Sequence, residues 1–340
     1  GWIVGRPPSR KRAAWKRWSW RVVLAIGLGY VFLYGPGIRL WPKAPGFERV
    51  GDESITVHYQ ARIEPQAQRT VTAVREAQQA VLDFWGRPDE HGFPFPVDLY
   101  LCATRSRYRH LILNNAMASA SGNDVIMDVR FPEEARARFL RHELAHLYVV
   151  HEYGWLRSRM HTPTWLDEGI ATVVQASDWS DETSLARSVT RTRELASLGS
   201  TNNILRWLGA VFGGGDRAGA QYAYVRAFTE ALLAKHGRDE VLGFLRQATL
   251  SGDHDQSFDN AFGTSLAEAE REWVAAATER GVLPADLKLV DRGVPAPLAA
   301  KFLIAAVVLV ALVLWAFRQL CRTLRAVRGL LTGRRSPANE

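Results

Sequence analysis

The chain contains few cysteines. Only two occur among its 340 residues, Cys102 and Cys321, and neither has a second cysteine close by in the sequence. A zinc site built from thiolates needs cysteines in closely spaced pairs, so this class of site is excluded. The membrane topology predicted below places the two cysteines on opposite sides of a bilayer, so no intramolecular disulfide is expected.

Acidic residues are scarce at both ends of the chain. Residues 1–21 hold seven Lys and Arg and no acid, and residues 318–340 hold six Arg with Glu340 as their one acid. The formal net charge of +8 therefore arises from the two ends, and about −4 remains for everything between them. We expect no nucleic-acid partner, because the basic residues lie in the tails.

Polar residues are missing from two runs beside these basic ends. Residues 302–317 are all apolar, and counting from Leu298 gives about 20 residues, enough to cross a bilayer. The run 22–34 is shorter and ends at a Gly-Pro-Gly turn. No convincing small-residue cleavage site follows it, so we expect an uncleaved signal anchor over 22–38, with a cleaved signal peptide as the alternative.

The basic flanks of both runs predict that both termini lie in the cytoplasm. Residues 39–297 would then lie outside the cytoplasmic membrane, in the periplasm or at the cell exterior. The sequence therefore predicts a two-pass protein of the cytoplasmic membrane, with the lipid bilayer as one of its partners.

Between the apolar runs, short strand patterns come first and helical patterns follow. Alternating apolar residues predict strands over 54–59, 95–102 and 124–129, and helical periodicity predicts a helix over 64–85. From Pro132 onward nearly all segments are helical. The predicted organisation is a basic cytoplasmic tail (1–21), a signal anchor (22–38), a globular domain (47–285), a transmembrane helix (298–317) and a second basic cytoplasmic tail (318–340).

The stretch "FLRHELAHLYVV" (139–150) carries the most specific pattern in the chain. One helical turn separates His142 from His146, so both imidazoles can reach one tetrahedral Zn²⁺. Glu143 borders such an ion without having to bind it, and could take a proton from water bound there and pass it to a leaving amine. The opposite face carries the expected core residues Leu140, Leu144 and Leu147.

Two histidines do not complete a catalytic zinc site, and an HExxH pattern arises by chance in about one such sequence in a hundred. Glu168, 22 residues after His146, lies in a second predicted helix and is the expected third ligand. Asp167 is the competing ligand. We prefer Glu168 because Gly169 would let two helices approach closely, and Thr172 could support the ligand from one turn further on.

"HELAH" (142–146) followed by "TPTWLDEGIA" (162–171) resembles the gluzincin metallopeptidases, most closely the peptidase MA-like group, whose second motif reads W-L-x-E-G-x-A. The resemblance covers roughly 50–280, strongly at these motifs and loosely elsewhere. It implies an α+β, zincin-like domain, with a small mixed β-sheet lobe and a helical lobe, between the two predicted transmembrane helices. It also implies the zinc ligands His142, His146 and Glu168, and Glu143 as the general base and acid.

The same resemblance implies where substrate would bind. Aminopeptidases among the gluzincins usually carry a G-x-M-E-N-type strand, and the corresponding "NDVIMDV" (123–129) here favours internal cleavage of peptides. In zincins the edge strand before the HExxH helix commonly pairs with extended substrate. The main chain of that strand is therefore expected to bind substrate at Val125, Ile126 and Met127.

A donor to the developing oxyanion is also expected. Tyr222 matches a tyrosine that is frequent at this position in the family. The alternatives for this role are Tyr224, His151 and His161.

The leading hypothesis is a membrane-anchored zinc metallopeptidase, an endopeptidase that acts on extracytoplasmic proteins or peptides. The alternative is a non-catalytic domain that binds peptides or cell-envelope partners and uses zinc as a brace. Proteolysis within the membrane is not expected, because the charged flank "EEARARFLR" (133–141) cannot lie in hydrocarbon.

Overall fold

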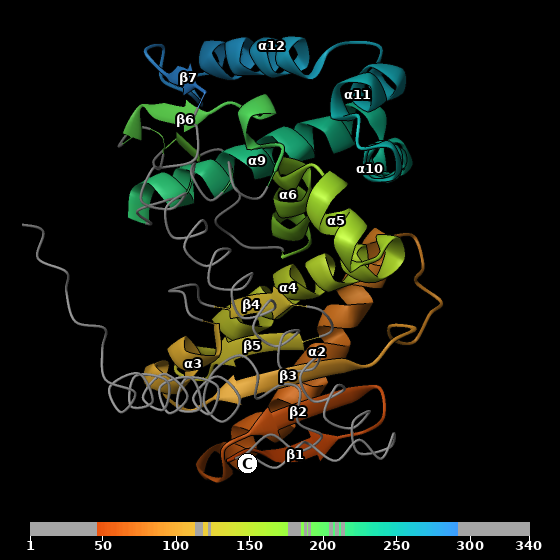
Figure 1. Cartoon of the computed structure of the whole chain (residues 1–340). Coiled ribbons are helices and arrows are strands. Elements are labelled where there is room, and N and C mark those ends of the chain that lie inside the picture. Colours follow the sequence, from red (N-terminus) through yellow and green to blue (C-terminus); the bar gives the residue numbers. More distant parts are fainter. Residues whose placement is uncertain are drawn as a thin grey trace, which may run out of the picture.

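The computed structural model describes residues 46–112, 118–121, 124–175, 185–186, 189, 192–203, 207, 211 and 215–291. Within them, a five-stranded sheet comes first and a mainly helical part follows (Figure 1). The described chain is thus a mixed α/β structure that is mostly helical.

The sheet has a mixed topology, with parallel strands inside and antiparallel strands at both edges. Its spatial order is β1-β2-β3-β5-β4; β2, β3 and β5 run parallel, and β1 and β4 are antiparallel to their neighbours. The strand bounds are β1 Glu48–Gly51, β2 Ile55–Tyr59, β3 Val97–Cys102, β4 Ala118–Ser121 and β5 Asp124–Asp128. The helices between strands are α2 (Glu64–Phe84) and α3 (Arg105–Ile112).

Both faces of the sheet are packed. Side chains alternate along each strand, so Val57, Leu99 and Met127 share one face, which α2 and α4 (Glu133–Tyr153) cover. On the other face, Tyr100 and Ile126 are among the residues that pack against α3. This packing fixes α4 against the sheet, which matters because α4 carries the HELAH motif.

The strand that the sequence predicts as an edge is an interior strand, so that prediction is wrong. β5 pairs with β3 on one side and with β4 on the other. Val125, Ile126 and Met127 are buried, and their strand has a partner on both sides. A substrate main chain therefore cannot add to β5. Among the described residues, β4 ends the sheet on this side.

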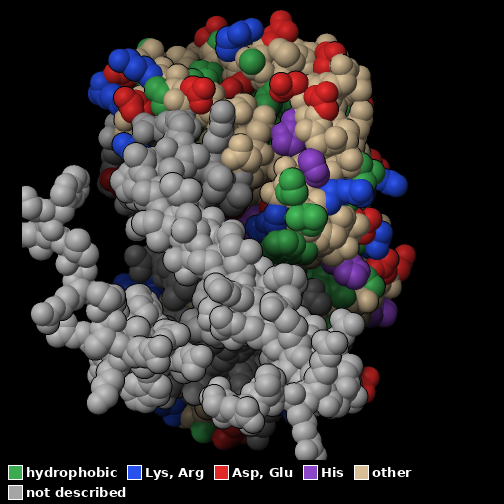
Figure 2. Space-filling model, viewed as in Figure 1, with side chains coloured by type: hydrophobic (Ala, Val, Ile, Leu, Met, Phe, Trp, Pro, Cys, Tyr) green, Lys and Arg blue, Asp and Glu red, His purple; other side chains and the backbone are tan. Residues whose placement is uncertain are grey.

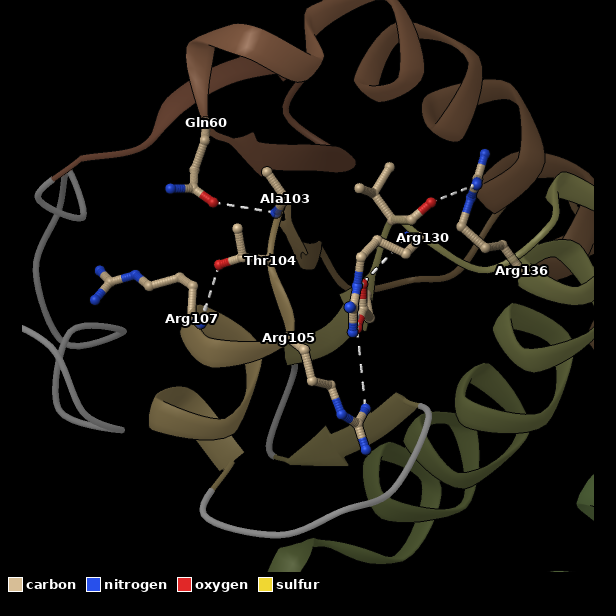
Figure 3. Close-up of polar contacts among 9 residues, drawn as sticks. Gln60, Ala103, Thr104, Arg105, Arg107, Arg130 and Arg136 are labelled. Atoms are coloured by element: carbon tan, nitrogen blue, oxygen red, sulfur yellow. Dashed lines mark hydrogen bonds and ion pairs between the residues drawn. The ribbon is translucent and has the colours of Figure 1, made fainter.

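A polar network closes the turn between β5 and α4 (Figure 3). The carboxylate of Asp128, which is fully buried, accepts hydrogen bonds from Arg130, 2.7 Å from Nη2 and 3.0 Å from Nε. Nη1 of Arg136 donates to the carbonyl oxygen of Val129 at 2.9 Å. Charge-assisted bonds of this kind hold the turn and therefore the start of α4.

The helices that follow build the second part of the molecule. Their bounds are α5 Trp155–His161, α6 Thr164–Val174, α9 Gly215–His236, α10 Arg238–Ser251, α11 His254–Phe262 and α12 Leu266–Glu279, with a small parallel pair of strands, β6 (Glu194–Ala196) and β7 (Lys288–Val290). Leu140, Leu144 and Leu147 are buried, which confirms the predicted core face of α4. α6 packs against α4 on one side and α9 on the other.

Gly169 makes the close contact between α6 and α9. A Cβ atom built there would lie 2.1 Å from Oγ1 of Thr229 and 3.1 Å from the carbonyl oxygen of Val225. The helix that approaches Gly169 is therefore α9.

We expect Gly169→Ala to lower the free energy of unfolding by about 1–3 kcal/mol, because the added methyl group forces the two helices apart. The measurement is urea denaturation followed by circular dichroism. Gly243→Ala, in α10, is the matched control, since nothing lies within 4 Å of its built Cβ atom. Alanine should stabilise that helix slightly. Equal effects of the two substitutions would contradict the close contact.

The prediction of flanking transmembrane helices is corrected. Among the residues that the structure describes, no helix is both long and apolar enough to cross a bilayer. The segments 22–38 and 298–317, and the tails 1–21 and 318–340, lie outside the described residues. The two-pass topology and the extracytoplasmic location rested on those segments, and both are withdrawn.

Candidate metal centre

α4 and α6 bring His142, His146 and Glu168 together. The Nε2 atoms of the two histidines lie 3.2 Å apart. Oε2 of Glu168 lies 3.3 Å from Nε2 of His142 and 3.5 Å from Nε2 of His146. Each side chain thus offers one ligand atom, and the three atoms are close enough to bind a single ion. This cluster could therefore hold a metal ion.

The cluster is held in a nearly closed environment. The exposed fractions of the three side chains are 12%, 12% and 11%, in the order His142, His146, Glu168. Oε2 of Glu168 is buried, and its polar neighbours are the two histidine nitrogens, with which it forms no well-aligned hydrogen bond. A buried carboxylate oxygen without such a bond is costly, and a cation between the two helices would remove that cost.

The electrostatics of the cluster also favour a bound cation. Burial raises the pKa of Glu168, but the nearby His146 and His142 outweigh it and hold that pKa well below its ordinary value. Burial lowers the pKa of His146, but Asp167 and Glu168 together raise it well above its ordinary value. The carboxylates therefore favour positive charge at the centre, which a bound cation would supply.

Asp167 occupies a different position from Glu168. Its Oδ2 atom lies 2.9 Å from Nδ1 of His146, on the side of the ring that faces away from the cluster. A carboxylate in this place fixes the orientation of the imidazole and makes it a more basic ligand. The two neighbouring acids of α6 thus have separate contacts.

We expect Asp167→Asn to weaken metal affinity by about 10–100-fold, because the amide holds the imidazole less firmly. Competition with a chromophoric chelator measures the affinity. Asp259→Asn, at an exposed position of α11, is the control and should leave the affinity unchanged. An Asp167→Asn protein with unaltered affinity would show that this contact does not orient the ligand.

Glu143 lies beside the cluster and next to the edge strand. Burial is the main factor that raises its pKa, the two histidines oppose that rise, and Glu168 adds to it. Its carboxylate accepts a hydrogen bond from the backbone N–H of Ala120 in β4. A carboxylate with a raised pKa at this place is suited to accept and release a proton.

Tyr222 reaches the cluster from α9. Its ring centroid lies 6.2 Å from that of His142 and 5.2 Å from that of Trp207. Burial, followed by the charge of Glu168, raises the pKa of Tyr222, and a hydrogen bond with the side chain of Trp207 opposes this. Because an indole N–H can only donate, it occupies the phenol oxygen and leaves the O–H of Tyr222 to donate elsewhere.

The other residues considered for an oxyanion role have different contacts. Tyr224 donates to Oε1 of the buried Glu270 at 2.7 Å. The ring of His151 stacks on Phe95 with centroids 4.0 Å apart, and the carbonyl oxygen of His161 accepts from His254. The hydroxyl of Thr172 donates to the backbone oxygen of Glu168 at 2.6 Å. None of these contacts involves the clustered side chains of His142, His146 and Glu168, and Thr172 contacts only the main chain of Glu168.

Two features of the site were not anticipated from the sequence. β4, whose sequence is "ASAS", lacks the β-branched and aromatic residues that mark a strand. Trp207 is far from the motifs along the chain, and only the fold places it against Tyr222. An aromatic pair of this kind has no local sequence signal.

No known protein-family model matches the chain, and no curated protein is significantly similar to it. The resemblance to the gluzincins therefore remains a prediction that rests on the two motifs.

Proposed function

We propose that this protein is a zinc-dependent metallopeptidase that cleaves peptide bonds within proteins or peptides. The spacing of the three ligand atoms is the main support. In a tetrahedral site with zinc–ligand distances of about 2.0–2.1 Å, neighbouring ligand atoms lie about 3.3–3.4 Å apart. The distances of 3.2, 3.3 and 3.5 Å are close to that value.

The donor set also suits zinc. Two imidazole nitrogens and one carboxylate oxygen are the ligands of catalytic zinc sites that keep a fourth position for water or substrate. When bound, zinc would act as a Lewis acid on water and on the peptide carbonyl. His142, His146 and Glu168 would hold it, and Asp167 would orient His146.

Two further residues, Glu143 and Tyr222, would transfer the proton and stabilise the developing charge. Glu143 would take the proton from the attacking water and pass it to the leaving amine. Tyr222 has its O–H available to donate, which suits it to stabilise the oxyanion. Both groups lie beside the three ligands, one in α4 and the other in α9.

β4 is the edge strand of the described sheet that lies beside α4 and Glu143, and we propose that an extended substrate pairs with it. The hydrogen bond from Ala120 to Glu143 places its main chain next to the proposed base. A substrate strand added to this edge would pass the scissile bond close to Glu143. A substrate that pairs along the β4 edge is bound over several residues, which agrees with cleavage inside the peptide.

The test uses the full chain and a mixed peptide library, analysed by mass spectrometry. We expect cleavage with zinc bound, loss of cleavage after chelation, and recovery when zinc is restored. A folded protein that binds zinc but cleaves no peptide would refute the proposal and favour the non-catalytic, zinc-braced binding domain. Cleavage that survives complete removal of metal would refute it as well.

We expect Tyr222→Phe to lower kcat by about 10–1000-fold with little change in KM, because the lost hydrogen bond forms only as charge develops on the oxygen. Steady-state kinetics on any peptide from the library measure both constants. Tyr59→Phe is the control, because Tyr59 lies in β2, which β3 and β5 separate from β4 in the sheet. An unchanged kcat would remove Tyr222 from the mechanism.

A further inference from the structure

α5 exposes an apolar surface next to the proposed active-site helices. Trp155, Leu156 and Met160 are 57%, 62% and 62% exposed, and Leu250 at the end of α10 is 48% exposed. The three residues of α5 share one side of the helix, while Ser158 on the opposite side is buried. Figure 2 shows hydrophobic side chains gathered over α5 with basic side chains beside them. We name these four residues the α5 patch.

Arginines surround the α5 patch. Arg157 and Arg159 alternate with its residues along α5, and Arg246 lies one turn before Leu250 in α10. Among the described residues, none of these three arginines forms an ion pair. Two acids lie nearby. Glu152 faces Arg87 at 4.0 Å, and Asp253, next to Ser251, caps α11 by accepting a hydrogen bond from the backbone N–H of Gln256 at 3.0 Å. The patch is therefore apolar with a positive border, and complements a partner that is apolar and acidic.

A hollow continues the patch along α10. It is open, has a volume of about 450 Å³, and is lined by Gly243, Arg246, Gln247, Leu250 and Ser251. α10 packs against α5, and the hydroxyl of Thr162, the residue after α5, lies 3.1 Å from that of Thr249 in α10. The exposed residues of α5 and the hollow, which Leu250 lines, therefore lie on neighbouring helices.

The position of this surface links it to the proposed site. α5 directly follows α4, which carries His142 and His146, and directly precedes α6, which carries Glu168. We propose that the α5 patch and the hollow together bind an acidic segment with apolar residues in the protein substrate, away from the bond that is cut. This inference rests on the proposed peptidase function.

Two other occupants fit less well. A second copy of the chain placed patch to patch would bring its arginines against Arg157, Arg159 and Arg246, and like charges repel. A flat anionic lipid surface would contact the apolar side chains of α5 but could not enter the hollow on α10. A peptide segment can meet both parts of the surface.

The first experiment measures binding alone. The full chain carrying Glu143→Gln is titrated into a fluorescent peptide that alternates Glu with Leu and Phe, and into the same peptide with Lys in place of Glu. We expect the acidic peptide to bind at least about tenfold more tightly, and 0.5 M salt to reduce that preference. Equal affinities for the two peptides would overturn the proposal.

Variants locate the binding surface. Replacing Trp155, Leu156 and Met160 by serine should weaken binding of the acidic peptide by at least about tenfold, and so should Arg159→Glu. These side chains are exposed, so the fold should survive, as thermal melting would show. Arg271→Glu, at an exposed position of α12, makes the same charge change elsewhere and should have no effect. Equal losses for Arg159→Glu and Arg271→Glu would overturn the proposal.

A vesicle assay tests whether the α5 patch binds a lipid surface instead. Vesicles of phosphatidylglycerol and phosphatidylcholine are sedimented with the protein. Binding that depends on Trp155 and that the acidic peptide does not displace would overturn the proposal in favour of an anionic membrane surface. Binding that is absent, or is displaced by the peptide, supports the peptide segment.

The second experiment separates this inference from the proposed function. Protein substrates with and without an acidic apolar segment are compared with a short peptide that holds the cleaved bond alone. We expect the serine variant to raise KM about tenfold for the substrate with the segment and to leave cleavage of the short peptide unchanged. If even wild type does not cut the short peptide, the peptidase proposal fails. If it does, but the serine variant treats all substrates as wild type does, only the α5 proposal fails.

Discussion

We expect Glu143→Gln to reduce kcat by about 10²–10⁴-fold while zinc affinity, the fold and the affinity for peptides stay unchanged. Glutamine has the same shape as glutamate, but its amide cannot accept a proton from the attacking water. The measurement is single-turnover cleavage of a library peptide, with metal content determined by atomic absorption. Because Glu143 does not belong to the three clustered ligands, its loss should affect turnover alone.

Glu152→Gln is the matched control for this result. Glu152 is an exposed glutamate of the same helix, and its substitution removes the same charge. It should leave kcat within about twofold of wild type, as expected for an exposed residue outside the site. A Glu143→Gln protein that turns over as fast as the Glu152→Gln protein would exclude Glu143 as the base.

The second large effect is expected on metal binding. Glu168→Gln should weaken zinc affinity by at least about 10³-fold, because a neutral amide replaces an anionic ligand and structural zinc sites bind with a total free energy of about 10–16 kcal/mol. Competition with a chelator of known affinity gives this value. Peptide cleavage should fall in proportion to the fraction of protein without metal.

Asp167→Asn is the internal comparison for Glu168→Gln. Both substitutions remove one carboxylate charge from adjacent residues of α6, yet one acid faces Nε2 of His146 and the other faces Nδ1. Glu168→Gln should therefore have the larger effect on affinity. The reverse order would assign the ligand to Asp167 and the orienting contact to Glu168.

The sequence predicts those parts of the molecule whose signals are local. The 3.6-residue period of α4 gives both its buried leucines and the common face of His142 and His146. In α6, Glu168 meets the histidines, as its spacing from His146 suggests.

Features that depend on contacts between segments far apart in the sequence could not be predicted in this way. The alternation of Val125–Val129 marks a strand but says nothing of how many neighbours that strand has. The short, small-residue strand β4 pairs with it through main-chain hydrogen bonds, which leave no trace in side-chain chemistry. Likewise, Gly169 predicts a close approach between two helices, but the fold decides that the second helix is α9.

If the cluster binds a metal ion, the contact at Gly169 would link that binding to the folding equilibrium. Glu168 faces α4, and the next residue, Gly169, lies against α9. The distance between α6 and α9 therefore helps to set where the carboxylate stands relative to the histidines. By thermodynamic linkage, an ion that binds only the native arrangement stabilises the contacts among all three helices, increasingly so as its free concentration exceeds its dissociation constant. The α6–α9 contact would then be a determinant of metal affinity, although it contains no ligand.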